Sequence, residues 1–141
     1  MTIKEWLQKA RKLNNEVEQL KMARQKALNL ACEATVGVDN EKVQTSKINS
    51  TESKFVTYAD YSKLLDDKIY ELTNYRIRVL GCINKLDNST YRTLLIARYI
   101  NCKTWEQIAE DMQFKDVRWT YVLHGRALKK MEEAIKPLPS P

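Results

Sequence analysis

Between residues 103 and 129 the chain gathers cationic, aromatic and hydroxyl side chains that are suited to contact a nucleic acid. Arginine can read a guanine edge, valine can touch a thymine methyl group, and lysine can neutralise phosphate. On this basis we expect Arg118 and Val122 to read bases and Lys129 to lie nearer the backbone. The candidate DNA-binding residues are Lys103, Thr104, Lys115, Arg118, Trp119, Tyr121, Val122, Arg126 and Lys129.

The positive charge of the chain lies at its two ends. The 141 residues carry a net charge of +6, which favours an anionic partner. Lysines and arginines outnumber acidic residues by seven to three in residues 1–31 and by five to one in residues 113–130, whereas residues 32–86 balance at eight each. The second excess coincides with the candidate DNA-binding residues.

Other chemistry finds little support in the sequence. It has no Gly-rich phosphate loop, no HExxH, no GxSxG and no carboxylate pair with a matched base, so we expect no enzyme and no cofactor. The single His124 and three cysteines without CxxC spacing argue against a metal site. No signal-peptide pattern and no run of eighteen apolar residues occurs, so we expect a cytoplasmic protein without a membrane partner.

Three short helices are expected to position the candidate residues. The first covers residues 89–100, and the second follows Thr104, with Gln107 at capping-box spacing. After a turn at 113–115, a third helix runs over residues 116–136. Helical angles place the buried face of this third helix around Thr120, and the opposite arc carries Arg118, Tyr121, Val122, Gly125, Arg126 and Lys129.

Two longer helices are expected upstream. Residues 2–34 and 58–86 each repeat apolar side chains at steps of three and four, and a non-periodic Ser/Thr/Asn-rich stretch at 35–57 separates them as a flexible loop. Leu64, Ile69 and Ile83 reinforce the second stripe. Both stripes must be buried, either in an antiparallel hairpin or against a second copy in a homodimer through residues 3–34 and 58–86.

The expected fold class is therefore all-α. A long helical hairpin or coiled coil occupies residues 1–86, a three-helix domain with a helix-turn-helix occupies residues 87–136, and a proline-rich tail covers residues 137–141.

The C-terminal third also resembles a known family. The second and third short helices and their turn read TWEQIAEDMQFKDVRWTYVLHGRALKKM, which resembles region 4 of sigma-70-type transcription factors. Residues 84–135, with YRTLLIARYINCKTWEQIAEDM and LHGRAL, resemble bacteriophage and prophage transcriptional regulators of the ArpU-type late-gene activator family. Gln113 stands where a helix-turn-helix usually has Gly, and the turn is one residue longer. The alignment of residues 115–122 with the family can therefore shift by one position. In one register Trp119 belongs to the core, and in the other it contacts DNA.

This resemblance implies a sequence-specific transcriptional regulator that binds double-stranded DNA of phage or prophage promoters in a bacterial host cell. Two alternatives stay open. A small terminase subunit that binds packaging DNA also combines a helix-turn-helix with oligomerising helices. The second alternative is an interaction module that binds host RNA polymerase, because sigma region 4 also contacts polymerase.

Overall fold

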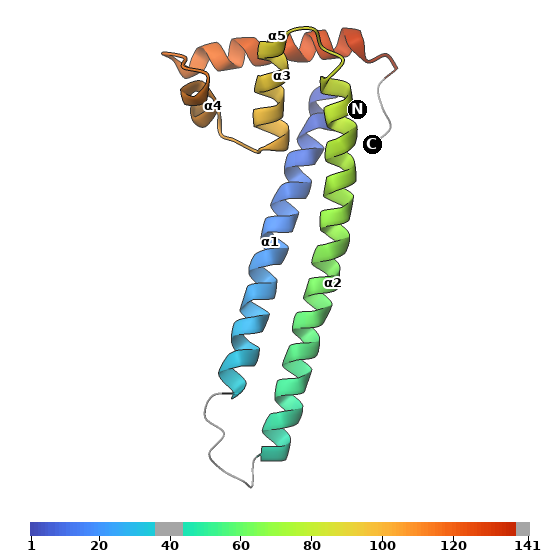
Figure 1. Cartoon of the computed structure of the whole chain (residues 1–141), viewed down its shortest axis with the longest axis vertical. Helices are drawn as coiled ribbons and strands as arrows, with labels where there is room; N and C mark the ends of the chain where they lie inside the picture. Colours follow the sequence, from blue (N-terminus) through green and yellow to red (C-terminus); the bar gives the residue numbers. More distant parts are fainter. Residues whose placement is uncertain (36–43, 138–141) are drawn as a thin grey trace. The chain divides into compact units, whose positions relative to one another are not determined.

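The computed structural model describes residues 1–35 and 44–137, and the regular elements in these ranges are all helices (Figure 1). The all-α fold class expected from the sequence is confirmed. Their order along the chain is α1 (Ile3–Thr35), α2 (Gln44–Ile83), α3 (Ser89–Leu95), the π-helix η2 (Ile96–Ile100), α4 (Trp105–Asp111) and α5 (Val117–Ala134).

Helix α1 begins and runs as its sequence predicts. Glu5 N donates to Thr2 Oγ1 over 3.2 Å, and Thr2 N donates to the Glu5 carboxylate over 2.9 Å, which completes a capping box. Leu20 and Arg24 are half-buried, and the side chain of Ala34 lies outside the described residues. The other members of its heptad stripe are buried: Ile3, Trp6, Ala10, Leu13, Val17, Ala27 and Ala31.

Helix α2 starts earlier than expected. The prediction of a loop over residues 35–57 is wrong for residues 44–57, which are helical; residues 36–43 lie outside the described part. Residues 44–57 are rich in Ser and Thr but contain no Gly or Pro to stop a helix. Thr57 Oγ1 donates to the Ser53 carbonyl over 3.0 Å, so its hydroxyl is satisfied within the helix.

The sequence predicts that the whole apolar stripe on α2 is buried, and the structure buries only part of it. Leu65, Leu72, Tyr75, Val79 and Ile83 are buried, as is Leu86 just beyond the helix, and Tyr58, Tyr61, Lys68 and Cys82 are half-buried. Leu64 and Ile69 are 56% and 37% exposed, so these two additions to the stripe are wrong. Both lie beside the seam and not on its three–four repeat.

The chain divides into two compact units, and each unit pairs a segment of α1 with a segment of α2. Residues 15–71 form one of them. Within it the Lys68 ammonium lies 2.9 Å from the Glu16 carboxylate, and the Arg24 guanidinium lies 5.9 Å from the centre of the Tyr58 ring. These contacts join the two helices in antiparallel order, as the hairpin alternative predicts.

The other unit joins residues 1–14 to the chain from Leu72 onward. The Tyr75 hydroxyl donates to the Trp6 carbonyl over 2.6 Å, and Arg76 donates to the Asn14 amide oxygen over 2.8 Å. The boundary therefore differs from the one expected at residue 86, because the first turns of α1 and the last turns of α2 belong with the short helices.

The short helices follow their expected order with one change of geometry. Asn88 caps α3 by accepting from Thr90 N and Tyr91 N, and the predicted single helix over residues 89–100 continues as η2. Asn101 N donates to Ile96 O over 3.0 Å, a step of five residues that marks the π-helix. Helix α5 ends at Ala134, two residues before the predicted end, and residues 138–141 lie outside the described part.

Candidate functional site

Helix α5 buries one face and exposes the other. Thr120 is fully buried, and Leu123, Ala127 and Met131 are buried on the same side. This face packs on α3 and α4, where Leu94, Leu95 and Ile108 are also buried. The predicted centre of the buried face at Thr120 is confirmed.

The opposite face of α5 carries the exposed candidate residues. Trp119 is 46% exposed, so in this structure it belongs to the surface and not to the core. The Arg126 guanidinium lies 5.3 Å from the centre of its ring. The exposed members of this surface, which we call the α5 face, are Arg118, Trp119, Tyr121, Val122, Arg126 and Lys129.

The remaining candidates lie before α5, and two of them have partners within the chain. The Lys103 ammonium forms an ion pair with Asp111, across α4. The Thr104 hydroxyl accepts from Gln107 N over 3.2 Å, and Gln107 Oε1 accepts from Thr104 N over 2.9 Å, so the predicted capping box is confirmed. Lys115 is exposed in the turn before α5. Lys103 and Thr104 therefore contribute to the stability of α4 whether or not they touch a ligand.

The turn between α4 and α5 is closed by a residue in the left-handed region. Gln113 has φ 61°, the conformation for which Gly is preferred at a helix C-terminus. Phe114 N donates to the Ala109 carbonyl over 2.8 Å, and Gln113 N donates to the Glu110 carbonyl over 3.1 Å. A glutamine thus occupies the position at which a helix-turn-helix usually has Gly, and its backbone takes the conformation that favours glycine.

Asp116 and Arg118 are joined at the start of α5. One carboxylate oxygen of Asp116 accepts from Arg118 N over 2.9 Å and so caps the helix. The other accepts from Arg118 Nε over 2.9 Å and from Nη2 over 2.7 Å. The hydrogen bonds from Arg118 lower the pKa of Asp116 and raise that of Arg118.

An aromatic cluster lies beneath this surface. The Trp105 ring stands edge-on to His124 and Tyr121, with ring centres 4.7 and 5.3 Å apart, and the Arg98 guanidinium lies 4.0 Å from its ring centre. His124 Nε2 lies 2.6 Å from the Tyr99 hydroxyl. His124 is therefore buried and hydrogen-bonded within the chain.

Burial changes the acid–base behaviour of this cluster. Desolvation, followed by the charges of Lys4 and Arg98, lowers the pKa of His124 to about 4. Desolvation raises the pKa of Tyr99 to about 12. Both side chains are therefore neutral at pH 7, and His124 serves α5 as a packing and hydrogen-bonding residue.

The first turns of α1 reach the loop before α4. Arg11 Nη1 donates to the carbonyls of Arg98 and Lys103 over 2.9 and 3.2 Å, and Arg98 Nη1 donates to the Lys103 carbonyl over 3.0 Å. The two carbonyls fix the Arg11 guanidinium against the segment that leads into α4. No local pattern signals a contact between residues 92 positions apart.

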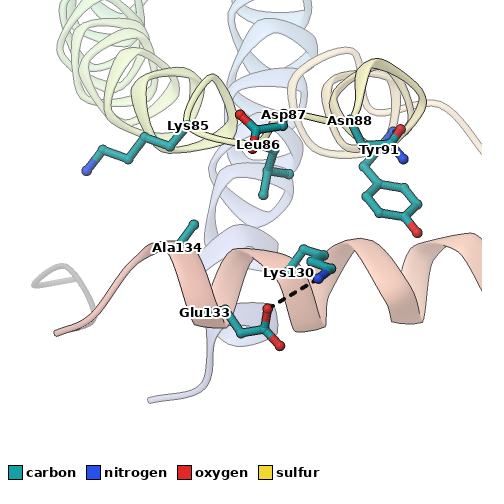
Figure 2. A pocket seen from close by; sticks show the side chains of 8 residues that line it. All are labelled: Lys85, Leu86, Asp87, Asn88, Tyr91, Lys130, Glu133 and Ala134. Atoms are coloured by element: carbon teal, nitrogen blue, oxygen red, sulfur yellow. Dashed lines mark hydrogen bonds and ion pairs between the residues drawn. The ribbon is translucent and has the colours of Figure 1, made fainter.

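A hollow of about 490 Å³ lies at the far end of α5 from Arg118 (Figure 2). Its walls mix charges of both signs, and Lys130 and Glu133 form an ion pair of 3.5 Å across its floor. A mixed-charge hollow does not favour an anionic ligand. The lining residues are Lys85, Leu86, Asp87, Asn88, Tyr91, Lys130, Glu133 and Ala134.

Within residues 1–35 and 44–137, no group of three His, Cys, Asp or Glu side chains is placed to hold a metal ion. No helix in these ranges combines the length and apolar character needed to cross a bilayer. Comparisons with protein families, with curated proteins and with solved structures find no match for this chain.

Proposed function

We propose that this chain binds double-stranded DNA in a sequence-specific way through the α5 face and regulates transcription of phage or prophage genes. The observation that carries the proposal is the outward arc of α5, which combines arginine, lysine, aromatic and valine side chains with a buried opposite face. A major groove about 12 Å wide admits one helix with such a face. The regulatory role comes from the resemblance to phage regulators.

The cations at this surface support an anionic partner. Residues 113–130 contain five lysines and arginines but a single acidic residue, Asp116. Trp119, Tyr121 and Val122 supply apolar area that a thymine methyl or a sugar can cover, and their exposed fractions lie between 42% and 46%. A helix surface with both features fits base reading better than it fits a purely solvated face.

The first test measures binding of a randomised duplex DNA library by fluorescence anisotropy at several salt concentrations. If Lys103, Lys115, Arg118, Arg126 and Lys129 carry binding and roughly four of these cations contact phosphates, we expect a log–log salt slope of about −4. A flat salt response would contradict DNA binding and favour a protein partner such as RNA polymerase. A large ring in light scattering would favour a packaging protein over a regulator.

A second test separates base reading from phosphate contact. Arg118→Ala is expected to cost about 1–3 kcal/mol on the preferred sequence and to relax preference at one base pair. Lys129→Ala is expected to weaken all sequences about equally and to reduce the salt slope by about 1. Lys130→Ala is the matched control, because Lys130 pairs with Glu133 beside the distant hollow. Equal losses in all three variants would contradict this assignment of the α5 face.

A further inference from the structure

The hydrogen bonds around Arg118 leave a particular part of its guanidinium for a ligand. Arginine has one N–H on Nε and two on each terminal nitrogen. Asp116 accepts from Nε and from one N–H of Nη2, along one side of the guanidinium plane. Among the described residues none accepts from Nη1. The end of the group, with one N–H of Nη1 and the second of Nη2, therefore remains as a pair of parallel donors.

This remaining pair matches the hydrogen-bonding edge of guanine. Guanine presents two acceptors, N7 and O6, in the major groove, and an arginine binds both through two parallel N–H groups. Arg118 is 85% exposed as a side chain, so solvent and DNA can reach its free end. A long exposed arginine otherwise samples many rotamers, and ordering it opposes binding.

We propose that Asp116 is a positioning residue for base reading, which holds the Arg118 guanidinium so that its free end is presented to a guanine. The inference rests on the proposed DNA-binding function and adds a specificity determinant to it. Asp116 touches no base in this role. It acts through Arg118 by fixing the orientation of the guanidinium before DNA arrives, while its other oxygen caps α5.

The cap and the positioning role can be separated by substitution. Serine at position 116 caps a helix about as well as aspartate but is too short and uncharged to hold the guanidinium. If Asp116 serves only as a cap, Asp116→Ser leaves base preference unchanged. Asp116→Asn keeps the cap and the shape but removes the charge from the interaction with Arg118, and it serves as the second variant if the serine protein melts early.

The experiment selects preferred sequences from the randomised duplex library with the wild-type chain and then measures affinity for every single-base variant of the best site. We expect one guanine whose replacement weakens wild-type binding, and we expect Asp116→Ser to reduce that discrimination roughly tenfold. Non-preferred DNA should bind Asp116→Ser as well as or better than wild type, since a negative charge is removed. In an Arg118→Ala background, Asp116→Ser should have no further effect on discrimination.

Glu110→Gln is the control for charge alone. Glu110 is exposed in the last turn of α4, so its substitution removes one negative charge without touching Arg118. It should raise affinity for all sequences without altering base preference. A wild-type protein that does not bind duplex DNA would overturn the proposed function itself. A wild type that selects guanine while Asp116→Ser selects it equally well would overturn the positioning role and leave DNA binding intact.

Discussion

His124 is a buried base at the centre of the aromatic cluster, 7% exposed and hydrogen-bonded to Tyr99. Its pKa of about 4 lies below the ordinary value of 6.5, so the unfolded chain takes up this proton before the folded chain does. The stability it contributes is fully present above pH 6.5 and is lost as pH falls toward 4. We expect a loss of roughly 2–3 kcal/mol across this window in urea unfolding.

His124→Gln is the control, because it removes the titrating group and keeps a polar side chain. Its unfolding free energy should vary less between pH 6.5 and 4. Asp116 does not act in this window: its pKa is lowered from 3.8, so its contribution is present above 3.8 and is lost only at lower pH. An unchanged pH slope in His124→Gln would contradict the assignment.

Thr120 lies at the centre of the buried face of α5 with a hydroxyl that has no partner among the described residues. Burying an unpaired hydroxyl is unfavourable, so Thr120→Val, which has nearly the same shape, is expected to raise the free energy of unfolding by about 1 kcal/mol. Thr104→Val is the matched comparison, because the Thr104 hydroxyl caps α4, and its loss should cost about 1 kcal/mol. A destabilised Thr120→Val protein would argue against the unpaired hydroxyl.

At the residue scale, helical periodicity predicted burial on α5 well and long-range contacts poorly. The angles placed Thr120 inside and Arg118 outside because burial follows the apolar repeat of the helix itself. The Arg11 contact with Lys103 and the Tyr99 contact with His124 join distant segments. Such contacts depend on how helices meet, which no local repeat records.

At the element scale, the turn between α4 and α5 is the connection that sets where the α5 face begins. Gln113 holds its closing position with φ 61°, a conformation unfavourable for residues with a Cβ atom. Gln113→Gly is therefore expected to raise the free energy of unfolding by about 0.5–1 kcal/mol in thermal or urea melts.

Lys115→Gly in the same turn is its control. Among the described non-glycine residues a positive φ occurs at Cys102 and Gln113, so the backbone at Lys115 does not need a glycine. Lys115→Gly should therefore lower the free energy of unfolding slightly. Equal effects of the two substitutions would show that the turn conformation does not limit stability.

Elements were predicted best where apolar residues repeat and caps are explicit. The Thr104 capping-box spacing located the start of α4. The prediction of a loop was wrong over residues 44–57. Their polar composition argued against a helix, but helical hydrogen bonding continues through them because they contain no Gly or Pro. The change to a π-helix at Ile96 has no composition signal of its own.

At the scale of the whole molecule, helix segments of the same chain cover most of both heptad seams. Within each unit the α1 segment contacts the α2 segment, so a second copy is not needed to cover the seams. We therefore expect the midpoint of thermal unfolding to be independent of protein concentration. A midpoint that rises with concentration would contradict this expectation.

The homodimer through residues 3–34 and 58–86 stays a prediction. With the seams occupied, such a dimer would have to use side chains on the outer faces of the helices. The large apolar side chains exposed on α1 and α2 are Met22, Leu30, Phe55, Val56, Leu64, Ile69, Tyr70 and Ile77. Light scattering of the wild type and of Ile77→Glu tests this for the unit that contains Ile77, since a dimer that packs through Ile77 should dissociate in the variant while its helical content is retained.

The pairing of residues 1–14 with the chain beyond Leu72 has a consequence for the order of folding during synthesis. Arg11 leaves the ribosome 87 and 92 residues before the two carbonyls that accept its hydrogen bonds. Trp6 meets a partner earlier, because the Tyr75 hydroxyl that donates to its carbonyl lies on α2. Antiparallel pairing of α1 with α2 shortens the effective loop that this closure requires. The hairpin is thus expected to form first on the nascent chain, and the unit that carries the α5 face is expected to close only after α5 has emerged.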